Sequence, residues 1–487
     1  MNEQSQKKTE NNGKQAQSNG LNKKPMIELF VCVNPLDYRY YGRDAKILEK
    51  AAPYLSEDAR IKYQLKVECA LVKVLAKYNI CSENIAKEVE EACGKVTTQE
   101  IYEEEDRIKH DIRALVNNIR KNVSDEAKPF VHFSMTSFDV IDTANALRFK
   151  EAVGALVIPS LKSLEKTLID LALREKDTVQ IGRTHGQHAE PITFGFAISE
   201  YVSRLGNRIK SIDVAKSNLR GKISGAVGAY NASSLLFGKP MEFECDVLKE
   251  LGLEPSTHST QIVEPEYVLD LTHYIVSAFG VIANLADDMR NLQRSEIGEV
   301  GEPFSADQVG SSTMPQKRNP INFENVKSFW KEFMPRMTTR YMDQISEHQR
   351  DLTNSASSRF IPEIMLAIVL SADRLNKIMK KMTVDKTNMQ NNFNKSKGMV
   401  IAEPLYILLA SHGHPNAHEH VRKLTLEAQK TGKSLSEIAT SDETLRPYLE
   451  KFTPRQREII ENPEKYTGIA AIKTVNVCDH WKNELSL

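Results

Sequence analysis

The chain has 487 residues, of which 40% are hydrophobic and 27% are charged, ordinary values for a soluble globular protein. This length exceeds what one compact core needs and predicts several domains. Lysine plus arginine equals aspartate plus glutamate at 65 each, so the net charge gives no indication of binding to nucleic acid or to a membrane surface. A small anionic ligand remains compatible with this balance, because a local cationic pocket needs no net charge.

The six cysteines form no Cys-x-x-Cys pair, and their low number in so long a chain indicates free thiols in a reducing compartment. We therefore expect a cytoplasmic protein. No apolar run approaches the roughly 18 residues that a membrane span needs, so we expect no contact with a membrane.

The first residues, 1–26, are rich in Asn, Gln, Lys and Ser and contain no apolar signal core. We predict a disordered tail here. Shorter helices follow in a first helical domain, residues 27–152, where Ile112, Leu115 and Ile119 recur at helical spacing together with Ile108.

Two groups of polar residues lie in this first domain. His110 is followed by Asp111, and such a pair is either a histidine held in one tautomer or, more commonly, two side chains on a helix surface. His132 precedes Thr136 and Ser137, whose hydroxyls could either bind a carboxylate or cap a helix.

The central part, residues 153–385, carries apolar stripes that step by three and four residues over 12 to 22 positions, the pattern of long helices in a bundle. The stripes are Val157–Leu161–Leu164–Leu168–Leu171, Phe194–Ile198–Tyr201–Leu205, Leu271–Ile275–Ala278–Ile282–Leu285–Met289–Leu292 and Ile364–Ile368–Leu375–Ile378–Met382. Alternating strand-like runs are scarce, so the sequence predicts an all-α fold of three helical domains. Helices this long often form a bundle that is shared between subunits, which predicts a homo-oligomer.

A polar segment, Gly182–Pro191, lies inside this bundle region and contains Thr184 and His185. It precedes a helix that we expect to begin near Thr193. The free N–H groups of a helix start attract anions, and a nearby imidazole can protonate a leaving nitrogen near neutral pH. A surface turn with two incidental histidines is the alternative.

A second polar segment, Gly310–Pro320, reads Gly-Ser-Ser-Thr-Met-Pro-Gln-Lys-Arg-Asn-Pro and contributes nothing to a core. It predicts a mobile loop that brings a hydroxyl, backbone N–H groups and a lysine to an anion. Ser311 is the candidate base for removing a weakly acidic C–H proton, if Lys317 and loop N–H groups stabilise its alkoxide. The alternative is an ordinary Ser/Gly linker.

Two further segments contain several polar or charged residues. Arg350 and Arg359 flank several serines and could hold a phosphate or a carboxylate, although a capped helix start is the simpler interpretation. The histidine-rich run 412–420 suggests a metal, but Pro415 interrupts the helical register between His414 and His418. We therefore predict a solvated loop followed by a helix start, and no metal site. The last part, residues 386–487, returns to short helices and proline-bearing turns.

The loop motif resembles Gly-Ser-Ser-x-x-Pro-x-Lys-x-Asn of the fumarase/aspartase superfamily, whose members release fumarate by β-elimination. The other motifs follow in the order typical of the adenylosuccinate lyases within that superfamily, and the resemblance covers nearly the whole chain after the tail. Those motifs are Arg39-Tyr40, His110-Asp111, Thr136-Ser137, Thr184-His185-Gly186-Gln187, Gly225–Gly228, Thr260-Gln261, the loop, Phe323-Glu324-Asn325 and Arg350–Thr353. The resemblance implies an all-α homotetramer in which each active site draws on three subunits, a nucleotide substrate, and neither a metal nor an organic cofactor.

The resemblance also implies a role for each matching residue. Ser311 would remove the proton, His185 would donate one to the departing amine, and Glu324 would orient His185. His110, Asp111 and His132 would hydrogen-bond around the substrate. Those implied for the phosphate and its surroundings are Arg39, Tyr40, Arg350, Ser355 and Arg359; those implied for the succinyl part are Thr136, Ser137, Thr184, Gln261, Lys317 and Asn319.

Three positions depart from the family pattern. Ser134 stands where a small residue, often Gly or Ala, precedes the Thr-Ser pair, and Phe138 stands where a polar residue usually follows it. Gln316 matches argininosuccinate lyases better, which makes that activity the alternative; Arg39-Tyr40 and the Arg350 segment argue for a phosphate that argininosuccinate lacks. A non-catalytic, crystallin-like member would be expected to have lost Ser311, His185 or Lys317, and all three are present.

Overall fold

The computed structural model describes residues 29–304, 313–314 and 316–487. The chain falls into two compact units, one that ends at Lys50 and a larger one, Ala51–Leu487. The predicted tail, 1–26, lies outside the described residues, and the three predicted helical domains remain a prediction.

The N-terminal unit contains a short 3-10 turn (Leu29–Val31) and a π-helical turn (Leu36–Gly42), and then the start of helix α1 (Ala45–Leu55). The side chain of Asn34 accepts a hydrogen bond from the Leu36 N–H at 3.0 Å, which starts the π-helical turn. The rings of Phe30 and Tyr38 lie with centroids 4.4 Å apart and join the two turns.

Helices α2 to α6 open the larger unit, and short polar residues start most of them. The five helices are α2 (Glu57–Lys77), α3 (Glu83–Lys95), α4 (Thr98–Ile108), α5 (Asp111–Lys121) and α6 (Ser137–Ala152). Ser56 accepts from the Ala59 N–H at 3.1 Å, and Thr97 and Glu100 form a reciprocal capping box before α4. Because α4 ends at Ile108, the predicted run Ile108–Ile119 is divided between two helices.

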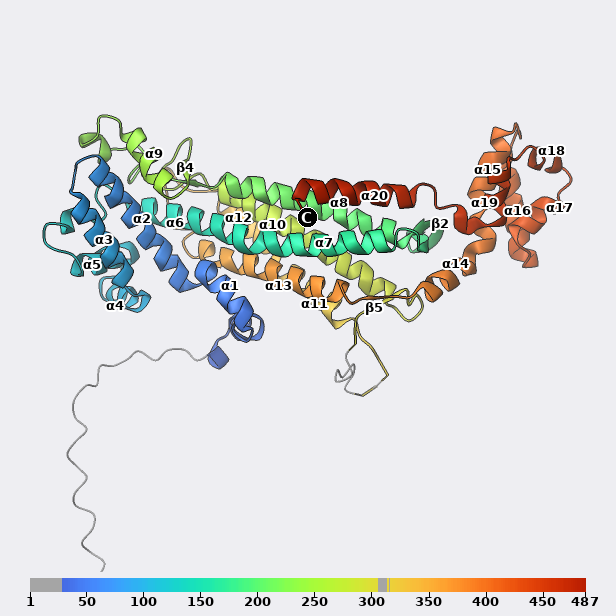
Figure 1. Ribbon diagram of the computed structural model, residues 1–487, viewed down its shortest axis with the longest axis horizontal. Helices are drawn as coiled ribbons and strands as arrows, with labels where there is room; N and C mark the ends of the chain where they lie inside the picture. The colour runs from blue at the N-terminus through green and yellow to red at the C-terminus, as the bar shows by residue number, and fades with distance from the viewer. Residues whose placement is uncertain (1–28, 305–312, 315) are drawn as a thin grey trace, which may run out of the picture. The chain divides into compact units, whose positions relative to one another are not determined.

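The long helices form the expected bundle. They are α7 (Ile158–Arg174), α8 (Phe194–Ser217), α10 (Glu266–Leu292), α11 (Ile321–Phe333), α13 (Ile361–Met379) and α20 (Ala470–Leu485). Helix α8 packs against α7, α10 and α20, and α13 packs against α7, α10 and α11 (Figure 1). Most of the predicted stripe residues are fully buried, among them Leu161, Leu205, Ile275 and Ile368. The prediction of an all-α fold with a long-helix bundle is therefore confirmed.

Three two-stranded sheets are the only strands in the part of the chain that the structure describes. They are β1 (Val179–Thr184) with β2 (Gln187–Thr193), β3 (Arg220–Gly221) with β4 (Glu254–Pro255), and β5 (Val300–Gly301) with β6 (Thr383–Val384). The β1–β2 hairpin was not predicted, since its polar residues do not alternate with apolar ones in the usual way.

Helix α10 corrects the expectation about membrane spans. By length and composition alone it is apolar enough to cross a membrane, yet 61% of the relevant window is buried inside the protein. Its apolar residues pack against α8, α11 and α13. Burial on most of its surface therefore explains its composition, as expected for a core helix.

The last helix returns to the bundle from a separate cluster of short helices. Helix α20 packs on α7 and α8 (Figure 1). The indole of Trp481 lies so close to Gly206 on α8 that an added Cβ would approach it to 2.3 Å. A side chain at position 206 would therefore force α20 away from α8.

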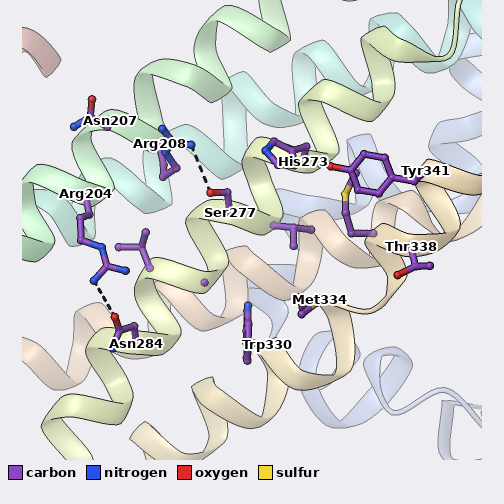
Figure 2. A pocket seen from close by; sticks show the side chains of 14 residues that line it. Arg204, Asn207, Arg208, His273, Ser277, Asn284, Trp330, Met334, Thr338 and Tyr341 are labelled. Atoms are coloured by element: carbon purple, nitrogen blue, oxygen red, sulfur yellow. Dashed lines mark hydrogen bonds between the residues drawn. The ribbon is translucent and has the colours of Figure 1, made fainter. Parts of the chain in front are cut away.

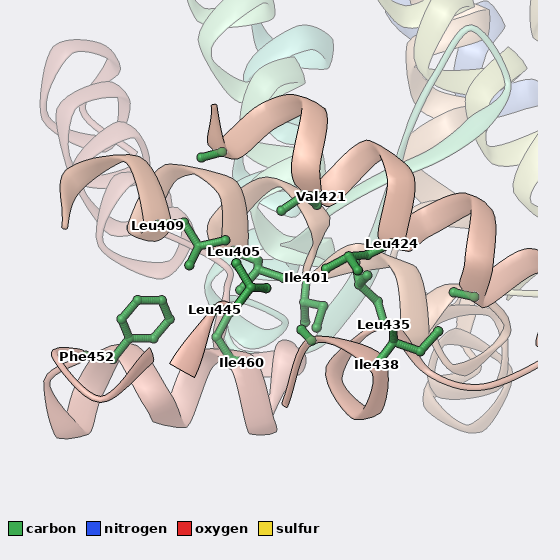
Figure 3. Close-up of a cluster of buried hydrophobic side chains, with 13 residues drawn as sticks. Ile401, Leu405, Leu409, Val421, Leu424, Leu435, Ile438, Leu445, Phe452 and Ile460 are labelled. Atoms are coloured by element: carbon green, nitrogen blue, oxygen red, sulfur yellow. The ribbon is translucent and has the colours of Figure 1, made fainter. Parts of the chain in front are cut away.

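The short C-terminal helices enclose their own apolar cluster (Figure 3). They are α14 (Lys386–Val400), α15 (Ala402–Ser411), α16 (Ala417–Thr431), α17 (Leu435–Ser441), α18 (Arg446–Leu449) and α19 (Pro454–Glu461); α9 (Pro240–Glu250) and α12 (Arg336–Met342) complete the fold. Leu405, Leu409 and Leu435 are inaccessible to solvent at the centre of the cluster.

Two leucines of α16 provide a matched test of this cluster. Leu424 is 6% exposed inside it, whereas Leu426 is 43% exposed. We expect Leu424→Ala to lower the free energy of unfolding by about 2–5 kcal/mol, because it removes buried methyl groups and leaves a cavity. Leu426→Ala should change it by no more than about 0.5 kcal/mol. Urea denaturation would measure both; equal losses would contradict the placement of the two side chains.

Candidate functional site

Five predicted site residues gather at the start of α6: His132, Thr136, Ser137, Gln261 and Arg350. Together with Asp139 and the loop 222–225, which were not predicted, we call them the α6 cluster. A single carboxylate, that of Asp139, connects most of its parts. Asp139 accepts hydrogen bonds from the N–H groups of Thr136 (2.8 Å), Ser224 (3.1 Å) and Gly225 (3.2 Å).

Asp139 also forms an ion pair with Lys222, and both side chains are fully buried. The Lys222 ammonium donates a further hydrogen bond to the Gly225 carbonyl at 3.0 Å. A buried charge is tolerated only when it is paired and hydrogen-bonded, and both members of this pair are. The ion pair therefore fixes the loop 222–225 against the Thr136-Ser137 turn, where Ser137 begins the helix.

Neither Asp139 nor Lys222 was predicted as a site residue. A signal was present, because Thr136-x-x-Asp139 has the spacing of a capping box. Lys222 carries no such signal, since its partner is 83 residues away in the sequence.

His132 is held by a second buried carboxylate, that of Glu68 on α2. The His132 N–H donates to Glu68 at 2.9 Å, and the ring Nδ1 lies 2.8 Å from the other carboxylate oxygen. Burial alone would lower the pKa of His132, but the charge and the hydrogen bond of Glu68 outweigh it and raise the pKa above its ordinary value. His132 has a φ of 62°, in the left-handed region that few non-glycine residues adopt.

His110 serves as the N-cap of α5, so its pairing with Asp111 is not the dominant contact. Its Nδ1 accepts from the Arg113 N–H at 3.2 Å, whereas Asp111 lies 3.7 Å away and accepts from its own neighbour Ile112 at 2.7 Å. The sequence left two interpretations of His110-Asp111: a histidine held in one tautomer, or two side chains on a helix surface. The second fits this geometry. More than half of the His110 side chain is exposed.

Arg350 reaches the α6 cluster from the segment before α13. Its guanidinium lies 3.5 Å from the centroid of the Phe138 ring, and its Nε is buried without a hydrogen-bond partner. Phe138 thus supplies a cation–π surface for a site arginine, which accounts for an aromatic residue after the Thr-Ser pair. Ser134, at a φ of 60°, occupies the left-handed conformation that glycine adopts most easily.

Burial lowers the pKa of Arg350, and the nearby carboxylates of Asp142, Asp351 and Asp111 oppose this shift. Burial raises the pKa of Asp142 to about 6. The Val263 N–H, which donates to this carboxylate at 2.9 Å, opposes the rise. The other side of the guanidinium is held by Asn354, whose side-chain oxygen accepts from Arg350 Nη2 at 3.4 Å.

Four other predicted binding residues remain to be located, and Gln261 is joined to the Arg350 segment by a hydrogen bond. The Gln261 N–H donates to the Gln349 carbonyl at 3.4 Å, next to Arg350. Ser355 and Arg359 are exposed on the segment that leads into α13. Arg39 and Tyr40 belong to the N-terminal unit, on the turn Leu36–Gly42, and their role stays a prediction.

Thr184 and His185 are exposed at the tip of the β1–β2 hairpin, where His185 and Gly186 have φ values of 55° and 76°. Successive positive φ values are typical of the tight turn of a two-residue hairpin. The helix does begin after Thr193, whose hydroxyl accepts from the Phe196 N–H at 3.2 Å. However, strand β2 separates His185 from that helix start, so the expected free N–H groups are not beside the imidazole.

The base of the hairpin is fixed by Glu299, which is fully buried. Its carboxylate accepts from Gln180 (2.7 Å), Arg183 (2.6 Å) and Asn392 (2.9 Å). Three residues later, Glu302 caps α11, accepting from the N–H groups of Asn322 (2.9 Å) and Phe323 (2.8 Å). The segment Glu299–Glu302 therefore joins the hairpin to the end of the Gly-Ser-Ser loop. We call this region the hairpin cluster: it consists of the β1–β2 hairpin, Glu299–Glu302 and residues 316–324.

The hairpin cluster includes the other predicted residues of the loop. Lys317 and Glu324 are exposed, Asn319 is half-buried, and Glu324 lies in the first turn of α11. The Arg318 carbonyl accepts from Gln293 at 3.2 Å, at the end of α10. Ser311, the predicted base, lies outside the described residues.

Two long helices hold the α6 cluster and the hairpin cluster apart. Helix α8, with 24 residues, begins at the hairpin and ends before the loop 222–225, a span of about 36 Å. Helix α10, with 27 residues, begins after Gln261 and ends before Gln293, a span of about 40 Å. The structure therefore does not bring His185 to Thr136, Gln261 or Arg350 within one chain.

A groove of about 920 Å³ runs along the bundle between α8, α10 and α12 (Figure 2). Polar side chains cross it in pairs: Arg204 donates to Asn284 at 2.8 Å, and Tyr341 lies 3.0 Å from the His273 ring nitrogen. Trp330 and Met334 contribute apolar surface. None of the predicted site residues lines this groove, so its size alone does not make it the active site.

No group of three metal-ligating side chains occurs in residues 29–304 or 316–487. The histidine-rich run forms a chain of contacts in which His414 lies 3.0 Å from His420, and His420 lies 2.7 Å from Asp442. Helix α16 begins directly after Asn416, as the sequence predicted.

Two family models match the chain. The one described as Lyase matches residues 39–332, and the one described as Adenylosuccinate lyase C-terminal matches residues 346–456. The curated relatives include the adenylosuccinate lyases of Pyrococcus abyssi, 35% identical over 90% of this chain and 98% of the relative, and of Archaeoglobus fulgidus, 35% identical over 93% and 99%. That of Aquifex aeolicus is 33% identical over 81% of this chain and 90% of the relative.

Solved structures share the fold. A 3-carboxy-cis,cis-muconate lactonizing enzyme from Pseudomonas putida superposes with a TM-score of 0.78 at 23% identity, over 93% of this chain and all of that one. A fumarate lyase from Mesorhizobium gives a TM-score of 0.77 at 22% identity, over 88% and 97% of the two chains. At these identities the likeness concerns the fold alone.

The Asp139–Lys222 pair predicts a large effect from one substitution. Asp139→Ala should lower the free energy of unfolding by about 3–5 kcal/mol, because it leaves the buried Lys222 ammonium unpaired. Asp125→Ala is the control: Asp125 is 94% exposed in its pair with Lys128, so its loss should have little effect on the free energy of unfolding. Denaturation midpoints and slopes in urea would compare the two; a small effect at Asp139 would show that the pair does not anchor the loop.

Proposed function

The chain belongs to the adenylosuccinate lyase family of the fumarase/aspartase superfamily and is a lyase, and on this basis we propose that it cleaves adenylosuccinate to AMP and fumarate. One observation carries the choice of substrate: Arg350 lies on Phe138 with its Nε buried and unpartnered, inside the segment that matches the adenylosuccinate-specific model. A guanidinium held in this way suits a phosphate.

The reaction is a β-elimination. A base removes a proton from the carbon next to a carboxylate, the C–N bond breaks, and the departing amine takes up a proton. We assign Ser311 as the base and His185 as the acid, with Lys317 stabilising the developing negative charge and Glu324 orienting His185. The exposure of His185 at a hairpin tip supports a role toward a substrate that binds outside this chain's own bundle.

The α6 cluster would bind the substrate. Thr136 and Ser137 stand at the N-terminus of α6, where N–H groups favour a carboxylate, and Gln261 lies beside Arg350 through Gln349. Thr184 and Asn319 would contact the succinyl part from the hairpin cluster. Asp111, His110, Ser355 and Arg359, with Arg39 and Tyr40 of the N-terminal unit, are assigned to the nucleotide on the resemblance alone.

A complete site requires more than one subunit. The acid and the loop lie at one end of α8 and α10, and the substrate-binding residues lie about 36–40 Å away. We propose a homotetramer in which copies of the chain pack along the groove of Figure 2, so that the ends of neighbouring bundles meet. Exposed apolar side chains continue this face: Met334, which follows α11, is 42% exposed, Met342 at the end of α12 is 67% exposed, and Ile345 beyond α12 is 79% exposed. Three subunits would then contribute to each site.

Two narrower assignments are part of the proposal. The succinylaminoimidazole carboxamide ribotide of purine biosynthesis presents the same phosphate and the same succinyl-amine, so the site would accept it as a second substrate. A cytoplasmic location would follow from such a role in nucleotide synthesis, and the free thiols of Cys69, Cys81, Cys93, Cys245 and Cys478 agree with a reducing compartment.

Fumarate release tests the function directly. The purified protein should release fumarate from adenylosuccinate and not from argininosuccinate. Ser311→Ala should lower turnover by about 100-fold or more, because a positioned base typically contributes that much. Ser312→Ala, the neighbouring serine, is the control and should keep most of the activity. Release from argininosuccinate alone would mean that Gln316 indicates the substrate and that Arg350 does not bind a phosphate.

Mixing two inactive variants tests the shared site. His185→Asn and Arg350→Ala should each be nearly inactive, since each removes one cluster's contribution. After dissociation and reassembly of an equal mixture, about a quarter of the sites should combine two intact clusters from different chains and regain activity. A mixture of His185→Asn with His185→Ala is the control and should stay inactive. If the first mixture recovers no activity, each site takes His185 and Arg350 from the same chain, and the proposal of a shared site is wrong.

A further inference from the structure

We propose that Glu68 is a positioning residue of the active site, which holds His132 protonated and aimed through its Nε2 at the negatively charged substrate. The contacts between Glu68 on α2 and the turn 132–134 are the observations behind this inference. Its effect on catalysis rests on the proposed function. Glu68 itself would not touch the substrate, because its side chain is fully buried.

Glu68 binds His132 at two points, and together they fix both the backbone and the ring. The backbone N–H donates to one carboxylate oxygen at 2.9 Å, which holds a turn whose residues His132 and Ser134 have φ values of 62° and 60°. The ring Nδ1 lies 2.8 Å from the other oxygen. An acceptor-only carboxylate at that distance requires a proton on Nδ1, so in either protonation state Nε2 is the atom left for another partner.

The charged groups around His132 come from three helices. Glu68 on α2 and Asp139 on α6 favour the imidazolium, whereas Arg113 on α5 and burial disfavour it. The Glu68 carboxylate is the closest of these groups, and removing its charge leaves burial and Arg113 opposed mainly by Asp139. The protonated state of His132 therefore depends on Glu68.

An imidazolium at this place has a chemical use. His132 is 19% exposed, which leaves part of the ring accessible beside the Thr136-Ser137 turn. A dianionic phosphate or the carboxylates of a succinyl group would be attracted by the positive charge and would accept a hydrogen bond from Nε2. Loss of the Glu68 charge would weaken both effects without removing the imidazole.

Glu68→Gln tests the inference, with Glu165→Gln as the matched control. Glu165 on α7 is also fully buried, but both its oxygens lack a hydrogen-bond partner, and burial raises its pKa well above the ordinary value. Glutamine is nearly isosteric with such a neutral carboxyl group, so Glu165→Gln should change neither His132 nor activity.

Two readouts are needed. The first readout is hydrogen–deuterium exchange at the Cε1 of each histidine, carried out on the folded protein at a series of pH values. Digestion and mass spectrometry of the peptide that contains His132 then give its pKa separately from the pKa values of the other 11 of the 12 histidines. We expect a value above the ordinary 6.5 in the unmodified protein and a lower value in Glu68→Gln, because the charge and the hydrogen bond of Glu68 are lost. The alkaline limb of kcat/KM for fumarate release should move to lower pH by the same amount as the measured His132 pKa.

Each outcome decides the inference. A lower His132 pKa and a shifted limb in Glu68→Gln, with neither change in Glu165→Gln, would support it. An unchanged His132 pKa in Glu68→Gln would overturn it, and so would a His132 pKa below 6.5 in the unmodified protein, a measurement that does not depend on any variant folding. If the unmodified protein releases no fumarate from adenylosuccinate, the proposed function fails, while the pKa measurement still judges Glu68.

In a double-mutant cycle, Glu68→Gln should have no further effect on kcat/KM in a protein that already carries His132→Gln. An additional loss of the same size in that background would show that Glu68 acts by a route other than His132 and would overturn the inference.

Discussion

The length of two rigid helices is the constraint on which the functional architecture depends. An α-helix has a fixed rise per residue, so α8 and α10 cannot bring their two ends together. The predicted site residues on either side of these helices therefore lie at one end or the other: the hairpin and Glu302 before α11 at one end, and the Thr-Ser turn, Gln261 and Arg350 at the other. Each end is then stiffened by a fully buried carboxylate, Glu299 and Asp139 respectively. Among the described residues, the two groups of predicted site residues therefore lie at opposite ends of the same two helices.

The parts of the fold that the sequence could predict are those governed by repeated apolar spacing. The stripes of α7, α8, α10 and α13 were predicted because residues such as Leu161 and Ile275 recur on one helical face. The β1–β2 hairpin could not be predicted in this way, since its form depends on a turn at His185-Gly186 and on packing against α14. Nor could the apolar length of α10 distinguish a core helix from a membrane span, because both bury such a helix on most of its sides.

The site residues divide along the same line. Motif residues such as His185, Thr136 and Arg350 could be proposed from local strings, yet their supports could not. Lys222 and Glu68 belong to a loop and a helix that no motif marks, and each meets its partner across 64 or more residues of sequence. Phe138 appeared as a departure from a family pattern, and only the position of the Arg350 guanidinium over its ring gives it a reason. Long-range electrostatic contacts of this kind leave no periodic trace in the sequence.

The return of α20 to the bundle has a consequence for synthesis of the protein. Trp481 lies against Gly206 and Cys478 lies against Ile169, so apolar surface on α7 and α8 is covered by residues that the ribosome adds roughly 300 positions later. Until the C-terminal helix has left the exit tunnel, that surface has no partner within the nascent chain. The bundle can therefore close only after α20 has emerged, and the interval before closure is when the nascent protein is most exposed to aggregation and most in need of chaperones.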